Sequence, residues 1–196
     1  HAVPIIYAAL HELGRISDEE LSLFREINSP LQGHPDKLRL SEIDATTGSL
    51  GQGLSIAIGH ALGKKLRKEH GKVFCVLGDG EMQEGQIWES LMCFPKFNLN
   101  NLVCIIDWNK GQNDGWSKDF APIYENLHER ILSFGWECHV IDGHNVDIIS
   151  TNLALKSDKP LCLIMDTLKG KGVSFMESPS WHAKIPTEEE YQKAKS

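Results

Sequence analysis

Short apolar runs alternate with segments of helical spacing along most of this sequence. The runs have the length and composition of buried strands, and they occupy residues 72–77, 101–107, 136–141 and 161–167. Helical patterns lie between them, over residues 81–94, 122–134 and 145–156. Strands that alternate with helices form a parallel sheet with helices on its faces. We therefore expect an α/β fold with a central, mostly parallel sheet and helices on both faces.

Two shorter helices are expected before this alternating part. Apolar residues recur at helical spacing over residues 3–13, and Gly14 is suited to end that helix. Ser17 followed by Glu20 forms a capping box, which begins a second helix. We expect this second helix to run to about Ile27.

A long helix joins these two parts of the chain. It follows an irregular segment at 31–49 and is expected to reach about His70. The sequence contains no internal repeat and no low-complexity linker. We therefore expect residues 1–196 to form one domain.

The composition excludes several classes of protein. The formal net charge of −7 argues against a general nucleic-acid-binding protein, which carries a basic excess. No apolar run approaches the roughly 20 residues that cross a membrane. The five cysteines contain no C-x-x-C pair, which argues against zinc and favours reduced thiols in a cytoplasmic protein.

Polar residues follow the first two apolar runs at the point where each ends. Gly78-Asp79-Gly80 comes directly after the first run, and Asn109 follows the second. Adjacent parallel strands would bring the Asp79 carboxylate and the Asn109 amide oxygen together, and such oxygen ligands suit Mg²⁺ or Ca²⁺. A helix beginning at Glu81 would direct its first N–H groups to the same place, which favours a diphosphate. Asp-Gly is also a common turn sequence, so a purely structural role stays open.

A series of motifs resembles the transketolase family, specifically its N-terminal, diphosphate-binding half. The matching segments, in family order, are His1-Ala2-Val3, Gly33-His34-Pro35, Thr46-Thr47-Gly48-Ser49-Leu50-Gly51-Gln52-Gly53, Gly78-Asp79-Gly80-Glu81-Met82-Gln83-Glu84-Gly85, Asp107-Trp108-Asn109, Phe134-Gly135-Trp136, Asp142-Gly143-His144, Lys169-Gly170-Lys171-Gly172 and Trp181-His182. The resemblance implies a thiamine diphosphate-binding fold over nearly the whole chain.

The resemblance also implies roles for particular residues. The metal ligands would be the side chains of Asp79 and Asn109 and the backbone carbonyl of Gly111. The cofactor would be bound by Gly48, Leu50, Gly78, Asp79, Gly80, Glu81, Asn109 and His182. The catalytic histidines would be His34, His182 and His1, and Glu84 would belong to a network that links two cofactor sites.

The family's activity implies further components. Thiamine diphosphate, with Mg²⁺ or Ca²⁺, supports transfer of a two-carbon ketol unit between sugar phosphates, and the cofactor carries the difficult chemistry. The activating glutamate lies in a second, pyrimidine-binding domain, for which this chain has no room. We therefore expect a C-terminal partner subunit, an enzyme inactive without it, self-association across the cofactor domains, and an assembly of two small and two large subunits. The family's first helices would precede His1.

Some positions depart from the family pattern, and two other functions stay open. Ser49 stands where the family usually has proline, Ala183 follows His182 in place of glycine, and the loop at 111–116 is unusual. The first alternative is another thiamine diphosphate enzyme: a deoxyxylulose phosphate synthase, a 2-oxoacid dehydrogenase, or a subunit recruited to specialised sugar biosynthesis. The second is a non-catalytic phosphate-binding module, although no dinucleotide or P-loop glycine motif is present.

Overall fold

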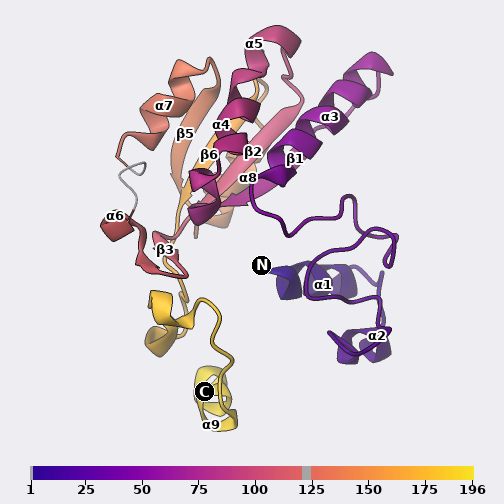
Figure 1. The fold of residues 1–196 in the computed structure, drawn as a ribbon, viewed down its shortest axis with the longest axis vertical. Helices are drawn as coiled ribbons and strands as arrows, with labels where there is room; N and C mark the ends of the chain where they lie inside the picture. Colours follow the sequence, from indigo (N-terminus) through magenta and orange to yellow (C-terminus); the bar gives the residue numbers. More distant parts are fainter. Residues whose placement is uncertain (1, 121–124) are drawn as a thin grey trace. The chain divides into compact units, whose positions relative to one another are not determined.

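The chain forms two compact units in the computed structural model, which describes residues 2–120 and 125–196 (Figure 1). Unit 1 is His1–Gln52 and unit 2 is Gly53–Ser196. Each unit has its own buried core. That the two make a single cofactor-binding domain stays a prediction.

Unit 1 contains two short helices and a long irregular segment. Helix α1 spans Val3–Glu12, and Gly14 follows it with a φ of +67°. Helix α2 spans Asp18–Ser22 and begins with the expected capping box between Ser17 and Glu20. Six residues form the core of the unit: Val3, Tyr7, Ile16, Leu31, Leu40 and Ile43.

Helix α2 is shorter than its sequence pattern predicts. It ends at Ser22 instead of continuing to about Ile27. The chain leaves the helical conformation because Arg25 adopts a φ of +65° and donates its N–H to the Leu31 carbonyl at 2.8 Å. A contact with a later segment therefore overrides the local preference for helix.

Unit 2 is built on a four-stranded parallel sheet. Its strands are β1 (Val73–Gly78), β2 (Leu102–Trp108), β5 (Glu137–Asp142) and β6 (Leu161–Asp166). Their order across the sheet is β1-β2-β6-β5, and every neighbouring pair is parallel. The predicted α/β class and parallel sheet are therefore confirmed.

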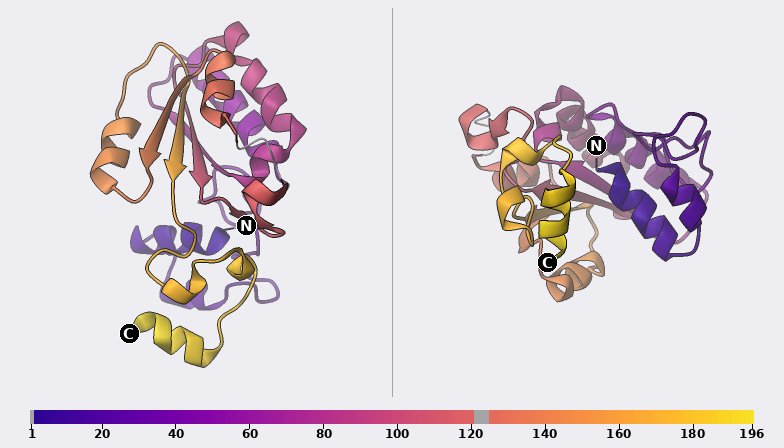
Figure 2. Two further views of the ribbon diagram at one scale, coloured as in Figure 1. Left: turned by 90° about the vertical axis from the view of Figure 1, so that its left-hand side faces the viewer. Right: turned by 90° about the horizontal axis from the view of Figure 1, so that it is seen from below.

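Helices cover both faces of this sheet, as predicted. Helices α3 (Gln52–Leu66), α4 (Gly85–Met92) and α7 (Leu127–Ser133) contribute to the larger core cluster on one face. Helix α8 (Val146–Leu153) lies on the opposite side of the sheet from α3 and α4 (Figure 2). Its residue Leu153 packs against the smaller cluster of Val103, Ile105, Leu161 and Leu163.

The connections of unit 2 contain smaller elements. They are the 3₁₀ turns η1 (Gly80–Gln83), η3 (Ser174–Met176) and η4 (Pro179–Trp181), the hairpin strands β3 (Gly111–Gln112) and β4 (Gly115–Trp116), and the helices α5 (Phe94–Phe97), α6 (Ser117–Phe120) and α9 (Glu188–Lys195). The hairpin replaces the loop expected after residue 110, because Gly111 pairs with Trp116 around a tight turn. Helix α9 is capped by Thr187, which forms a capping box with Glu190.

Two of the predicted helices in unit 2 differ in extent. The helix expected over residues 81–94 is divided into η1 and α4, because Glu84 is extended with a ψ of 128°. The helix expected to reach His70 ends at Leu66, since Lys68 adopts a φ of +57°. The helix expected over 122–134 is described from Leu127 onward, and its expected beginning at residue 122 lies outside the described residues.

The structure also bears on the cysteines and on membrane-spanning segments. All five cysteines are free. Within residues 2–120 and 125–196, we find no helix of the length and apolar character that crossing a membrane requires.

Candidate functional site

Asp79 lies at the carboxyl edge of the sheet, immediately after β1. Its side chain is 2% exposed, and both of its oxygens are held by backbone N–H groups. Gly80 N–H donates to Oδ1 and Lys110 N–H donates to Oδ2, each at 2.6 Å. Because Lys110 follows the neighbouring strand β2, the carboxylate is fixed between the ends of two adjacent strands.

Without a bound cation, burial makes the ionised form of Asp79 unfavourable. Burial raises the pKa of Asp79 to about 6, and the nearby Asp107 carboxylate acts in the same direction. The hydrogen bonds from Gly80 and Lys110 and the ammonium group of Lys169 oppose this increase in the pKa. A buried carboxylate with a raised pKa is stabilised when a cation binds next to it.

Asn109 stands at the corresponding end of β2, and its amide is oriented by its neighbours. Its Nδ2 donates to Asp107 Oδ2 at 2.9 Å, and its Oδ1 accepts from Gly111 N–H at 3.0 Å. Asp107 is held in turn by Thr167, whose hydroxyl donates to Oδ1 at 2.5 Å. Asp107 thus orients the Asn109 amide and is itself held by Thr167, which follows β6.

Two glycines of the predicted site lie close to side chains from other segments. A Cβ atom on Gly111 would lie 2.9 Å from Lys169 Cδ and 3.3 Å from Asn109 Oδ1. A Cβ atom on Gly80 would lie 3.1 Å from Gln112 Oε1. At both positions glycine lets the backbone come close to groups from neighbouring segments.

Lys169 lies near Asp79 and Gly111, although the sequence motifs gave it no individual role. It contacts Gly111, and its charge lowers the pKa of both Asp79 and His182. Its place in the Lys169-Gly170-Lys171-Gly172 motif was the available signal. Gly170 has a φ of +74°, and a Cβ atom there would lie 2.3 Å from the Met176 carbonyl oxygen, so the chain turns sharply directly after Lys169.

His182 follows η4 and is exposed. Partial burial lowers its pKa, and the positive charge of Lys169 adds to this effect. The electrostatic influence of Lys169 on both His182 and Asp79 places these three side chains in one region of unit 2. A largely neutral imidazole can accept a hydrogen bond or a proton there.

Two predicted glutamates, Glu81 and Glu84, follow Gly80 in the segment after β1. Glu81 Oε2 accepts a hydrogen bond from the Gly78 N–H at 3.2 Å. The expectation that an α-helix begins at Glu81 is wrong, because residues 80–83 form a 3₁₀ turn capped by Asp79. Glu84 is exposed and precedes α4 without capping it through its side chain.

Unit 1 brings together two other predicted site residues. His34 and Gly48 are in contact, and a Cβ atom on Gly48 would lie 2.8 Å from His34 Cγ. Gly48 has a φ of +142°, and Leu50 beyond it is 41% exposed. The His34 carbonyl and the Gln32 carbonyl both accept from the Tyr7 hydroxyl, at 3.5 and 2.8 Å. His1, the third predicted histidine, lies outside the described residues.

The donors at the edge of unit 2 fit a hard divalent cation. Asp79 supplies a buried carboxylate, Asn109 an oriented amide oxygen, and Gly111 a nearby backbone carbonyl. The described residues include no group of three His, Cys, Asp or Glu side chains placed to share a metal. A cation here would therefore need further oxygen ligands from a bound molecule and water, which is how Mg²⁺ is commonly held beside phosphates.

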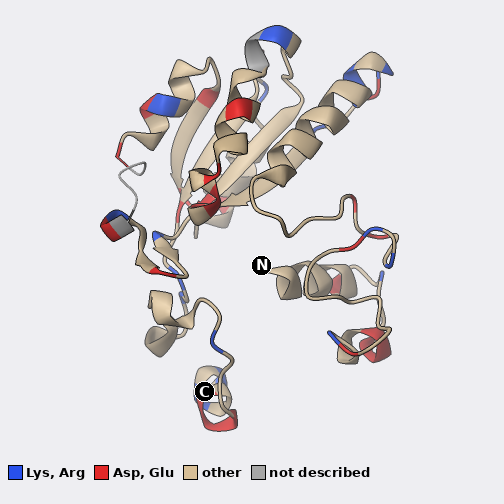
Figure 3. Ribbon diagram, viewed as in Figure 1, with Lys and Arg blue, Asp and Glu red and all other residues tan. Residues whose placement is uncertain are grey.

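Lysines elsewhere in unit 2 serve structural roles. Lys65, near the end of α3, donates to the carbonyls of Phe97 and Asn98 at 3.0 and 2.7 Å. Lys64 pairs with Glu69 at 3.7 Å. Figure 3 shows basic residues at the end of α3 and in α5, where the strands begin, away from the edge that holds Asp79. These contacts favour a structural role at the end of α3 over phosphate binding.

Comparisons with known proteins agree with this geometry. The family described as "Transketolase, thiamine diphosphate binding domain" matches residues 1–196. Transketolase-like protein 2 of Mus musculus is 42% identical over 191 residues, covering 94% of this chain and 30% of the relative. The chain thus spans about a third of the length of such relatives.

Two further relatives and one solved structure are informative. One of the subunits of the apulose-4-phosphate transketolase of Phocaeicola vulgatus is 38% identical, covering 99% of this chain and 70% of the relative. The 6-deoxy-6-sulfo-D-fructose transketolase subunit SqwG of Clostridium sp. is 39% identical, covering 99% and 71%. The crystal structure of transketolase from Campylobacter jejuni aligns with a TM-score of 0.83 at 32% identity, covering 90% of this chain and 29% of that one.

The four-stranded parallel sheet with helices on both faces defines the class as an α/β protein. Within that class, the chain belongs to the transketolase family, through its thiamine diphosphate-binding domain.

Proposed function

We propose that this chain binds the diphosphate of thiamine diphosphate through a divalent cation held by Asp79, Asn109 and the Gly111 carbonyl. The observation that carries the proposal is the buried Asp79 carboxylate, fixed by N–H groups from Gly80 and Lys110 beside the oriented Asn109 amide. Mg²⁺ suits this donor set, and Ca²⁺ could replace it. When bound, thiamine diphosphate supplies the chemistry that transfers a two-carbon ketol unit.

The residues around the cation have separate roles in this proposal. Gly80 and Gly111 allow the backbone to approach the diphosphate, because a Cβ atom would crowd Gln112 at the first position and Lys169 at the second. Lys169 adds positive charge near the diphosphate. His182, with its lowered pKa, accepts hydrogen bonds or protons from the cofactor or substrate.

His34, in unit 1, has a separate proposed role. Its ring lies against Gly48, whose φ of +142° only glycine adopts easily, so the loop holds the histidine in a defined place. We assign His34 to the hydroxyl or carbonyl groups of the donor sugar. Gly48 and Leu50 are assigned to contact with the cofactor's rings, and Glu84 to a network with a second cofactor site.

We further propose that this chain works with a pyrimidine-binding partner subunit that supplies the activating glutamate. Two relatives covered over 70% and 71% of their own length are named as transketolase subunits, which supports this organisation. The reaction would be ketol transfer between sugar phosphates, by two small and two large subunits that associate across the cofactor domains.

Titration calorimetry of thiamine diphosphate with Mg²⁺ tests the binding proposal, with and without the partner subunit. Asp79→Ala should weaken binding at least about 100-fold, since even residues that only support a metal ligand cost 10–100-fold. Asp79→Asn keeps the shape of the side chain and serves if the alanine variant is unstable. Asp158→Asn removes an exposed carboxylate just before β6, at the end of the sheet where the strands begin, and should leave binding unchanged. Equal binding by wild type and both Asp79 variants would contradict the proposal.

A specialised sugar substrate is the second candidate, favoured by the names of the same two relatives. One is named for apulose 4-phosphate and the other for 6-deoxy-6-sulfo-D-fructose. Ketol transfer by the reconstituted subunits should be measured with ordinary pentose and hexose phosphates and with these two sugars. A preference of at least tenfold in kcat/KM for one group decides between general and specialised metabolism.

A further inference from the structure

A pocket of about 370 Å³ lies beside the predicted metal site in unit 2. It is lined by Trp108 at the end of β2, by Lys110 and Trp116 around the hairpin, and by Ser117 and Lys118 at the start of α6. Its volume is within the range of sites that hold small molecules. None of these five residues was assigned a role in binding the cofactor.

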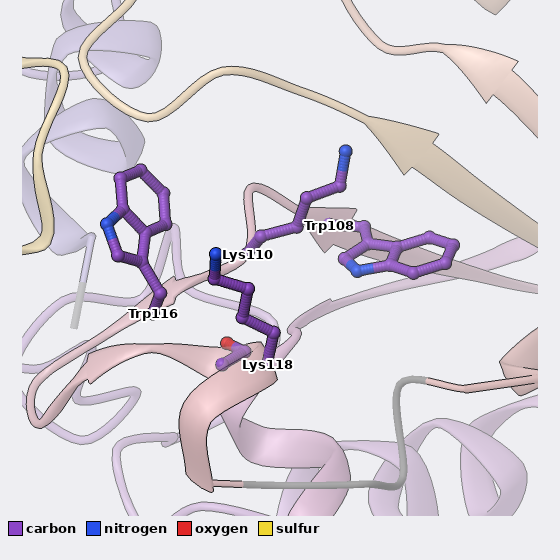
Figure 4. A pocket seen from close by; sticks show the side chains of 5 residues that line it. Trp108, Lys110, Trp116 and Lys118 are labelled. Atoms are coloured by element: carbon purple, nitrogen blue, oxygen red, sulfur yellow. The ribbon is translucent and has the colours of Figure 1, made fainter.

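The pocket combines two cationic groups with two aromatic walls. In Figure 4 the Lys110 and Lys118 side chains extend between the indoles of Trp116 and Trp108. The Lys110 ammonium group is held by Asp166 Oδ1 at 2.5 Å, and it lies 5.8 Å from the centre of the Trp108 ring. Among the described residues, Lys118 has no carboxylate within ion-pair distance, so the lining as a whole carries an uncompensated positive charge. This local charge is notable because the chain as a whole carries −7.

Two buried polar atoms of the lining residues lack hydrogen-bond partners. They are Trp108 Nε1 and Ser117 Oγ, for which the described part of the chain offers no partner. Ser117 is 1% exposed, and its backbone N–H is already engaged by the Lys110 carbonyl at 2.8 Å. A buried polar group without a hydrogen-bond partner is energetically unfavourable.

We propose that this pocket binds a small phosphorylated polyol. The phosphate group lies between the Lys110 and Lys118 ammonium groups, since lysine binds phosphate as a point charge. The carbon chain of the ligand lies against the face of Trp116, which is 36% exposed and offers apolar surface next to the charge. The hydroxyl groups of the ligand face the wall formed by Trp108 and Ser117.

The test uses the whole chain with ribitol 5-phosphate as the probe. The titration contains EDTA and no thiamine diphosphate, so its outcome does not depend on the proposed metal site. Ribitol 5-phosphate has no carbonyl group and takes no part in ketol transfer. We expect saturable binding by calorimetry, at least about fivefold tighter than for inorganic phosphate or for ribitol, because each probe alone makes only part of the contacts.

Two lysine-to-glutamine substitutions show whether the ligand binds in this pocket. Lys118→Gln should weaken ribitol 5-phosphate binding at least about fivefold, since the phosphate loses a charged hydrogen-bond donor. Lys159→Gln is the matched control. Lys159 is exposed and comes just before β6, at the end of the sheet where the strands begin, so its replacement should have no effect. Circular dichroism of both variants verifies that they are folded.

The Trp108 indole N–H resonance gives a second measurement that needs no lysine variant. Binding in this pocket should shift that resonance, which Trp108→Phe identifies. No saturable binding, equal binding of ribitol, an equal effect of Lys159→Gln, or an unmoved Trp108 resonance would each overturn the proposal.

Discussion

At the scale of single residues, the sheet edge depends on a carboxylate that is buried before any cation binds. Asp79 accepts two backbone N–H groups, yet burial still raises its pKa to about 6. Its ordinary pKa is 3.8. Between these two values the native protein retains a proton that the unfolded chain has released.

This difference predicts a pH dependence of stability in EDTA. Since the native state binds more protons between about pH 4 and pH 6, the free energy of unfolding should fall as pH rises through that window. The loss is at most about 3 kcal/mol, from about 1.4 kcal/mol for each pKa unit. Urea unfolding of wild type and Asp79→Asn at several pH values measures it.

The difference between the two proteins carries the prediction, because other groups titrate equally in both. The wild type should lose stability relative to Asp79→Asn as pH rises from 4 to 7. A difference that stays constant over this range would show that Asp79 has an ordinary pKa.

A second residue-scale prediction concerns the loop that holds His34. Gly48→Ala places a Cβ atom 2.8 Å from His34 Cγ at a φ of +142°, so it should destabilise unit 1 by about 1–3 kcal/mol. Faster hydrogen exchange over residues 31–52 measures the effect.

Gly59→Ala is the matched control, since Gly59 is exposed within α3 and has no atom within 4 Å of its added Cβ. Alanine there should stabilise the helix by about 0.5–1 kcal/mol. Similar effects of the two substitutions would contradict the contact between Gly48 and His34.

At the scale of elements, the second face of the sheet depends on α8. Asn145 caps this helix, and its side chain accepts from the N–H groups of Asp147 and Ile148, both at 3.1 Å. Leu153, in the last turn, packs against the apolar cluster on that face. The cap therefore fixes the helix that shields the middle strands.

Asn145→Ala should lower the free energy of unfolding by about 1 kcal/mol, because two N–H groups lose their acceptor. Asn145→Asp keeps an acceptor and should restore most of the stability. Thermal unfolding of the three proteins under one set of conditions makes the comparison. Equal destabilisation by both substitutions would show that the amide matters for another reason.

Element boundaries also show where local pattern has limited power. The capping boxes at Ser17 and Thr187 are set by residues three positions apart, and the first was predicted correctly. The early end of α2 follows from the backbone contact of Arg25 with Leu31, which no local pattern contains. The hairpin after Asn109 likewise depends on pairing between Gly111 and Trp116.

At the scale of the whole molecule, the two units differ greatly in the size of their cores. Unit 1 has six core residues, while the main cluster of unit 2 joins the sheet to three helices. A unit of about 50 residues buries a small share of its surface and has marginal stability by itself. We therefore expect unit 1 to unfold at a lower denaturant concentration than unit 2.

The distribution of tryptophan makes this prediction measurable. All five tryptophans belong to unit 2, at positions 88, 108, 116, 136 and 181. Tryptophan fluorescence thus follows unit 2 alone, whereas far-ultraviolet circular dichroism also follows the helices of unit 1. The dichroism signal should begin to fall at lower urea than the fluorescence. Coincident curves would show that the units unfold together.

The sequence by itself determined the fold class and much of the site. Apolar runs that alternate with helical patterns specify a parallel sheet, and the strand ends then bring Asp79 and Asn109 to one edge. These features are local or follow from a simple topological rule, so they can be recognised from the sequence alone. The roles of His1, of Mg²⁺ and of a partner chain stay predictions.

Only the tertiary structure decided how that edge is held and what lies beside it. The opposing effects of burial and Lys169 on Asp79, and the fixing of Asn109 by Asp107 and Thr167, join strands far apart in sequence. The pocket beside Trp116 likewise depends on how the hairpin folds back. Such properties arise from burial and from distances across the fold, which the order of residues does not state.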